Sequence, residues 1–220
     1  MRWYVVGGST LLSLATLWLV LNVASVLPVR QVFLVGNQGE MPVGRLDAAL
    51  RVVDNVHFFS DLSLLERKLS QEPWLDRVRI ERQYPWRWWL YYQVRTPILR
   101  WQHDAAMLDA KGEMMLVAVP ESLSNLPVVE ASADRARLVF ALWRQLGGVW
   151  QQRLLRIQQD ELGEWVLFFQ QGLQVRLGNQ ALVDRLDRFL QVARHWKVHA
   201  HEYAQYFDMR YASAFSHRRG

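Results

Sequence analysis

The chain has 220 residues, 51% of them hydrophobic, with a formal net charge of +5 and no cysteine. This hydrophobic content is sufficient for a folded core and argues against intrinsic disorder. The absence of cysteine excludes disulfides, zinc–thiolate sites, iron–sulfur clusters and cysteine nucleophiles. The modest charge would support nucleic-acid binding only if it were clustered. At ~150 residues per domain, the length corresponds to one or two domains.

The first element in the chain is an uncharged run, Trp3–Leu27. At ~1.5 Å of helical rise per residue, it is longer than the ~30 Å hydrocarbon core of a bilayer. A cleaved signal peptide is the alternative, with Val23–Ser25 as a small-residue cleavage site, but its apolar region should have only ~7–15 residues. We therefore expect residues 1–28 to form a short head and an uncleaved membrane-spanning helix.

Residues 29–100 predict a small unit of strands and helices. An apolar run that ends at Gly36-Asn37 is typical of a strand entering a turn, and Ser60 or Asp61 can cap a helix that stops before Pro73. The expected elements are a strand at 32–35, helices at 42–53 and 62–72, and strands at 77–81 and 86–95.

The stretch Trp86–Tyr92 places Arg87 among aromatic residues, a composition that also occurs on surfaces that stack nucleobases. The simpler interpretation is a strand with both faces partly covered. A protein or lipid-headgroup contact is the third interpretation, because Trp and Tyr favour places with one apolar and one wet side. Its candidate residues are Trp86, Trp88 and Trp89. We do not expect a nucleic-acid partner.

Residues 101–220 predict a second unit, made mainly of antiparallel strands with flanking helices. Both faces of segment 165–169 are apolar, which is typical of a central strand. Helical spacing over 134–146 ends at Gly147-Gly148, and the clearest helix covers 180–196, with an acidic and a basic residue paired at i,i+4. Other strands are expected at 108–113 as a hairpin, 126–128, 155–157, 173–177 and, as the last element, 207–215.

Catalytic and metal-binding patterns are incomplete throughout the chain. There is no GxSxG motif and no P-loop, and each cluster of ionisable residues lacks a partner that its chemistry requires. The clusters are His201-Glu202 with Gln205 in place of the second His of HExxH, His195 and His199 at i,i+4 without a third ligand, and Asp160, Glu161 and Glu164 in a predicted hairpin turn. We therefore expect no enzyme activity, no cofactor and no metal.

Several segments resemble the FtsQ/DivIB family of bacterial cell-division proteins. In the first unit they match its POTRA domain, and in the second its β domain, so the resemblance runs from about residue 1 to 215. Arg95-Thr96 and Ala214 depart from the family pattern, which has an acidic residue followed by Arg at the first place and Gly at the second. The matching segments are 35–37, 58–62, 73–78, 80–85, 96–101, 155–157, 165–167, 172, 177–178, 185–189 and 207–211.

The resemblance implies a fold and a role. The fold would be α+β, with a transmembrane helix at 1–28, a β-α-α-β-β POTRA domain at 29–100 and a β domain at 101–220. The role would be a non-catalytic divisome scaffold in the bacterial inner membrane, with a cytoplasmic N-terminus and a periplasmic C-terminal domain at the division septum. The partners would be FtsB, in complex with FtsL, and other divisome proteins. A strand of FtsB would add beside strand 207–215, contacted by Arg210, Tyr211 and Ser213.

Two other functions remain as alternatives. POTRA domains also occur in transport and outer-membrane assembly proteins, but those proteins end in a barrel of many strands of ~9–11 residues, which the second unit is too short to supply. An anchored hydrolase lacks its catalytic constellation. Exposed sheet edges accept partner strands through backbone hydrogen bonds, which favours the scaffold.

Overall fold

The computed structural model describes residues 31–37, 60–83, 87–102, 105–195, 205–211 and 216–219, and the single residues 16, 18 and 51. The chain divides into two compact units, Met1–Arg95 and Thr96–Gly220. The helices expected at 1–28 and 42–53 lie outside the described residues. Within the described ranges, no helix has both the length and the apolar character needed to cross a membrane.

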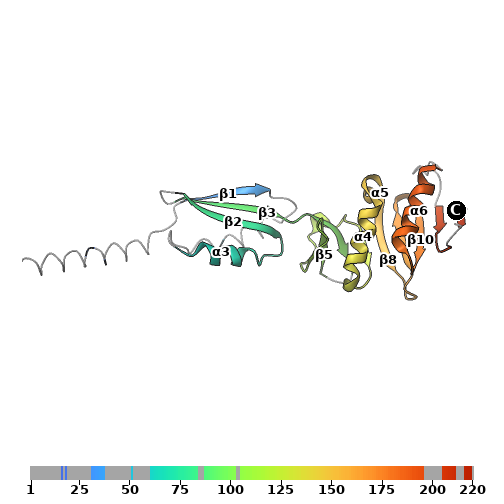
Figure 1. Cartoon of the computed structure of the whole chain (residues 1–220), viewed down its shortest axis with the longest axis horizontal. Helices are drawn as coiled ribbons and strands as arrows, with labels where there is room; N and C mark the ends of the chain where they lie inside the picture. The colour runs from blue at the N-terminus through green and yellow to red at the C-terminus, as the bar shows by residue number, and fades with distance from the viewer. Residues whose placement is uncertain are drawn as a thin grey trace, which may run out of the picture. The chain divides into compact units, whose positions relative to one another are not determined.

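The N-terminal unit contains a three-stranded sheet with one described helix along it (Figure 1). The central strand is β3, which pairs in parallel with β1 and antiparallel with β2. The strands expected at 32–35, 77–81 and 86–95 are therefore confirmed in type and place. The elements are β1 (Gln31–Asn37), α3 (Leu62–Leu69), β2 (Leu75–Gln83) and β3 (Arg87–Val94).

Helix α3 begins where the sequence predicts a cap. The Asp61 carboxylate accepts a hydrogen bond from the Ser63 N–H at 2.9 Å, which satisfies one free donor of the first turn. Hydrogen bonds from the Ser63 side chain and backbone lower the pKa of Asp61. The helix ends at Leu69, before Pro73, and it buries Leu65 and Leu69.

The C-terminal unit is built on a nine-stranded mixed sheet, in the order β12-β11-β10-β9-β8-β7-β4-β5-β6. Three neighbouring pairs are parallel, β4–β7, β7–β8 and β10–β11, and the other five are antiparallel. Its strands are β4 (Pro97–Trp101), β5 (Met107–Asp109), β6 (Met114–Met115), β7 (Val128–Glu130), β8 (Leu154–Gln159), β9 (Trp165–Phe169), β10 (Gln174–Gly178), β11 (Gln205–Asp208) and β12 (Ser216–Arg219).

Helices α4 (Ala136–Leu146) and α6 (Leu182–His195) pack on this sheet and contact one another (Figure 1). Their apolar stripes and the inner faces of the strands form one buried core, as the periodicity of both helices predicts. At its centre, Phe189 meets Phe169 and Phe207, with ring centroids 6.3 and 5.4 Å apart. Strand β9 is central, as expected. The short helix α5 (Gly148–Arg153) directly after α4 was not expected, and three 3-10 turns lie at 121–123, 133–135 and 170–172.

Two boundaries differ from the sequence expectation. The division between the units follows Arg95, because β4 pairs with β5 and β7 in the second sheet. The expected last strand at 207–215 is wrong: β11 ends at Asp208, and β12 then pairs antiparallel with β11 as the edge of the sheet. The Asp208 carboxylate accepts the Arg210 N–H at 3.1 Å, a local bond that competes with continued pairing along the strand.

Candidate functional site: the C-terminal end of the sheet

The segment after β11 contains the described residues that the resemblance assigns to partner binding. The Tyr211 side chain is 59% exposed, and Arg210 is half-buried beside it. Ser213 lies outside the described residues. The segment continues the parallel pairing of β10 with β11 by one step, because the Met209 N–H donates to the Arg176 carbonyl at 2.9 Å.

Arg210 is held by two carboxylates of its own chain. Its Nε donates to Asp208 Oδ1 at 3.0 Å, and its Nη2 donates to Asp208 Oδ2 at 2.7 Å. Its Nη1 donates to Glu164 Oε1 at 3.2 Å. Forked charge-assisted hydrogen bonds of this kind fix a guanidinium in direction as well as position. Arg210 therefore already has two carboxylate acceptors within its own chain, and its contact with a partner stays a prediction.

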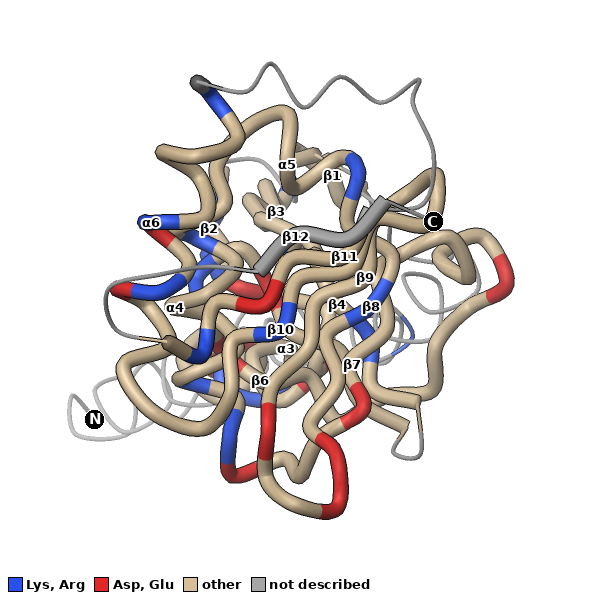
Figure 2. The backbone as a smooth tube through the Cα atoms, turned by 90° about the vertical axis from the view of Figure 1, so that its right-hand side faces the viewer, with Lys and Arg blue, Asp and Glu red and all other residues tan. Residues whose placement is uncertain are grey.

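Asp160 and Glu164 extend this ion cluster from the β8–β9 hairpin to β10. Arg176 lies with its Nε 3.0 Å from Glu164 Oε2 and its Nη2 3.5 Å from Asp160 Oδ2. The expected hairpin turn is confirmed, since Asp160 accepts the N–H groups of residues 162 and 164. The two carboxylates are nevertheless more than turn residues, because Glu164 ties the hairpin to Arg210 after β11 and Asp160 ties it to Arg176 of β10. Acidic and basic positions lie side by side near β10 and β11 in Figure 2.

The electrostatics of this cluster favour its charged state. Burial raises the pKa of Asp208, but hydrogen bonds and positive charge from Arg210, with a smaller contribution from Arg176, outweigh burial and lower that pKa below its ordinary value. Hydrogen bonds to Asp208 and Glu164 raise the pKa of Arg210 further above its already high value. Asp208 and Arg210 therefore form a charged pair at neutral pH.

Helix α6 supports the same segment from the other side. The Arg188 guanidinium donates to the carbonyl oxygens of Met209 and Tyr211 at 3.3 and 3.0 Å. Gly178 ends β10 with φ of +78°, and a Cβ there would lie 2.6 Å from Arg185 Nη1 and 3.1 Å from Arg210 Cγ. The backbone leading to Tyr211 is thus fixed from both the sheet and the helix.

The sequence did not reveal most of this support. The resemblance includes segment 207–211 but assigns no role to Asp208, and the i,i+4 spacing within 180–196 predicts Asp184 as the partner of Arg188. The one available signal was the i,i+2 spacing of Asp208 and Arg210 at the end of an apolar strand. Contacts from Glu164 and Arg188 cross 46 and 23 positions in the sequence, and no local pattern predicts them.

The tryptophans of β3 divide between the two faces of the sheet. Trp88 is fully buried, so it belongs to the core and must be removed from the expected contact surface. The alternation of the strand explains this, because Leu90 and Tyr92 are buried with it. Trp89 lies half-buried on the opposite face and stacks on Phe33 at 4.9 Å. Trp86 lies outside the described residues.

The histidine patterns of the sequence lie largely outside the described residues. Among the residues that the structure describes, no group of three or more His, Asp or Glu side chains could hold a metal ion. His199 and the His201-Glu202 pair lie outside the described residues, and the side chain of His195 is not described.

Comparison with known proteins decides the family. The model of the FtsQ/DivIB cell-division protein C-terminal domain matches residues 99–210, which is half of the chain and runs from within β4 to Arg210. The chain belongs to the FtsQ/DivIB family. It is therefore a cell-division protein of the FtsQ family, and Arg210 is the last residue of the matched region.

Individual FtsQ relatives extend over the N-terminal unit as well. The chain is 26% identical to the cell division protein FtsQ of Shewanella oneidensis over 87% of its own length and 78% of the relative. It is 25% identical to the cell division protein FtsQ of Neisseria meningitidis serogroup B over 99% of its own length and 92% of the relative. Against FtsQ of Cellvibrio japonicus it is 24% identical over 64% of its own length, and the match spans only 44% of the relative. Against FtsQ of Hahella chejuensis, 59% of the relative is spanned.

Proposed function

We propose that this FtsQ-family chain is a non-catalytic scaffold of the divisome that binds the FtsB–FtsL complex by strand addition at β12. The observation that carries the proposal is the end of the nine-stranded sheet, where β12 pairs with β11 on one side and has no further strand of the described chain beside it. Such an edge offers backbone donors and acceptors to an incoming strand.

Tyr211 and Arg210 have different roles in this proposal. Tyr211 is exposed and would act as the aromatic anchor for the partner, since aromatic side chains dominate binding energy at interfaces. Arg210 would act mainly by holding the backbone before Tyr211, because Asp208 and Glu164 already accept its hydrogen bonds. Ser213 would contact the partner beyond Tyr211, in line with the family resemblance.

The N-terminal part would place this site in the cell. The β-α-β-β order of β1, α3, β2 and β3 supports a POTRA domain that recruits other divisome proteins. The uncharged run Trp3–Leu27 supports a single membrane anchor. We propose an inner-membrane protein at the division septum with its N-terminus in the cytoplasm and both folded units in the periplasm.

Substitution of Tyr211 tests the proposal most directly. Tyr211→Ala in the full chain should reduce co-purification with the FtsB–FtsL complex more than tenfold, because an aromatic anchor is worth about 2 kcal/mol or more. Tyr91→Ala is the matched control, since Tyr91 is also an exposed tyrosine but lies on the N-terminal sheet. Unchanged binding by Tyr211→Ala, with hydrogen exchange of the C-terminal unit as in the wild type, would refute the assignment.

Arg210 gives a second test that separates the two roles. Arg210→Glu should weaken FtsB–FtsL binding and also increase hydrogen exchange at 207–211, because it places a third carboxylate beside Asp208 and Glu164. Loss of binding with no change in exchange would instead show that Arg210 contacts the partner directly.

A further inference from the structure

One end of the N-terminal sheet combines exposed aromatic rings with arginines. Register pairs Gln31 of β1 with Arg87 of β3, and Arg87 with Gln83 of β2, so the start of β1 and the β2–β3 hairpin lie at the same end. We call this the hairpin end of the sheet. The opposite end is marked by Gln93 and its register partner Arg77, six residues or about 20 Å further along β3.

The rings at the hairpin end are ordered but only partly covered. Phe33 remains 37% exposed, although it stacks on Trp89 with ring centroids 4.9 Å and planes 20° apart. Trp89 Nε1 donates to Gln83 Oε1 at 2.5 Å, which orients its ring. All seven residues of the edge strand β1 are exposed. This apolar surface is unusual for a protein exterior that faces only water.

Positive charge accompanies these rings. The Arg87 guanidinium carbon lies 6.0 Å from the Phe33 ring centroid, and that of Arg82 lies 6.0 Å from the Trp88 ring centroid. The three strands carry two acidic residues, and each lies near a neighbouring arginine: Asp76 is 4.0 Å from Arg77, and Glu81 is 2.9 Å from Arg79. The charge of Arg87 therefore remains uncompensated by an acidic residue of these strands.

The length of the connecting chain decides what this end can reach. The uncharged run finishes at Leu27, only four residues before Gln31 at the start of β1. Four residues span at most ~14 Å even when fully extended. The headgroup layer on each side of a bilayer occupies ~5–8 Å of that distance. Arg87, which pairs with Gln31, is thus confined to the neighbourhood of the lipid headgroups.

We propose that the hairpin end of the N-terminal sheet binds the surface of an anionic phospholipid bilayer. The inference rests on the membrane anchor included in the proposed function. Phe33 and Trp89 lie among the headgroups, where aromatic residues are enriched, and Arg87 pairs with lipid phosphates. An acidic protein segment has matching charge, but nothing holds it at this end, whereas the short connection holds the bilayer there at all times.

Fluorescent probes at the two ends of the sheet test the proposal. The chain contains no cysteine, so Gln31→Cys and Gln93→Cys each accept a single label at an exposed glutamine. The full chain is placed in nanodiscs of phosphatidylcholine alone, or of phosphatidylcholine and phosphatidylglycerol in equal parts, with a nitroxide on a fraction of the headgroups. We expect strong quenching at position 31 that increases with phosphatidylglycerol, and weak quenching at position 93.

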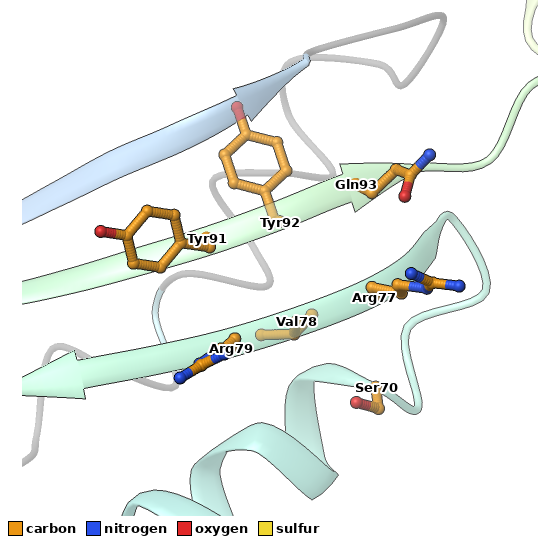
Figure 3. A pocket seen from close by; sticks show the side chains of 7 residues that line it. All are labelled: Ser70, Arg77, Val78, Arg79, Tyr91, Tyr92 and Gln93. Carbon is orange, nitrogen blue, oxygen red and sulfur yellow. The ribbon is translucent and has the colours of Figure 1, made fainter.

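Two charge-matched variants then test the role of Arg87. Arg87→Gln should lower the equilibrium constant for headgroup contact about fivefold in the anionic nanodiscs, the effect of one arginine at a charged surface. Arg77→Gln removes the same charge at the far end of the sheet, beside Gln93 (Figure 3). It should change the equilibrium constant for headgroup contact less than about twofold, because that end lies farther from the hairpin end than the screening length.

Several results would overturn the inference. Equal quenching at positions 31 and 93, no response to phosphatidylglycerol, or equal effects of Arg87→Gln and Arg77→Gln would each contradict it. No quenching in either lipid would contradict membrane binding and favour a protein partner for the aromatic surface. If the full chain does not associate stably with phosphatidylcholine nanodiscs, the proposed membrane anchor is wrong, and this inference fails with it. FtsB–FtsL binding is measured in the same samples, so a failure of the proposed partner binding at β12 is detected independently of the lipid result.

Discussion

The edge strand β1 of the N-terminal sheet and the segment after β11, which precedes the edge strand β12 of the C-terminal sheet, are held in different ways. Every residue of β1 is exposed, and its contacts are backbone pairing, stacked rings and one hydrogen bond from the Val94 N–H to the Asn37 side chain. The segment after β11 is instead fixed by Asp208, Glu164 and Arg188. The edge at β1 suits contact with a broad surface, whereas the fixed segment after β11 suits a partner that must meet the backbone in one register.

The largest difference between the two edges should appear on removal of a buried ring. Phe207→Ala should destabilise the C-terminal unit by about 3–5 kcal/mol, because Phe207 is fully buried and packs edge-to-face on Phe189. Phe33→Ala, at an exposed ring of β1, should cost less than about 1 kcal/mol. Chemical denaturation with hydrogen exchange resolves the two units in the full chain. A similar cost at both positions would show that β1 is as tightly packed as the second core.

A smaller effect is expected from removal of one charge in the ion cluster. Asp208→Asn should cost about 1.5–3 kcal/mol, because it weakens three hydrogen bonds to Arg210 at a buried carboxylate. Glu161→Gln is the control, since it removes the same charge at an exposed position of the nearby hairpin. The readout is the denaturation midpoint together with exchange at 207–211. Equal midpoints for the two variants would mean that the cluster adds no stability.

Backbone geometry at the end of β10 should matter slightly less. Gly178→Ala should destabilise the C-terminal unit by about 1–2 kcal/mol, because φ is +78° and the new Cβ would displace Arg185 and crowd Arg210. Gly148→Ala is the matched control, since nothing lies within 4 Å of its added Cβ. FtsB–FtsL affinity should fall for Gly178→Ala alone. Unchanged affinity would show that the position of the Arg210 side chain does not affect partner binding.

The smallest effect is a dependence on acid pH. The pKa of Asp208 is lower in the folded chain, so its stabilisation is complete above the unfolded value of ~3.9 and is lost as pH falls through the folded pKa. The wild type should therefore progressively lose its stability advantage over Asp208→Asn as the pH falls below about 4. Denaturation curves of both proteins at each pH measure this. A constant difference would contradict the lowered pKa.

The sequence predicts regular elements better than it predicts the site. Helix α3 is set by the Asp61 cap and its leucine spacing, and β9 by an apolar run on both faces; both signals are local. The end of β11 depends on Asp208 and on Glu164, which is distant in the sequence. No hydrophobic periodicity in the sequence indicates these contacts. The aromatic composition of 86–92 predicts one contact surface that includes Trp88 and Trp89, whereas strand alternation places these two side chains on opposite faces of the sheet. The resemblance points to Arg210 and Tyr211 as partner-binding residues, which stays a prediction, and only the structure shows that Arg210 is paired within the chain.

The parallel pairing of β10 with β11 bears on the order in which the C-terminal unit folds. Parallel neighbours need a crossover, and here α6 lies between the two strands in the chain. We expect β11 to dock after α6 has packed on β10, because Arg188 of that helix holds the segment after β11. Contacts between distant parts of a chain form late. We therefore expect the proposed docking edge to be assembled last, so that only a completely folded C-terminal unit is competent for assembly.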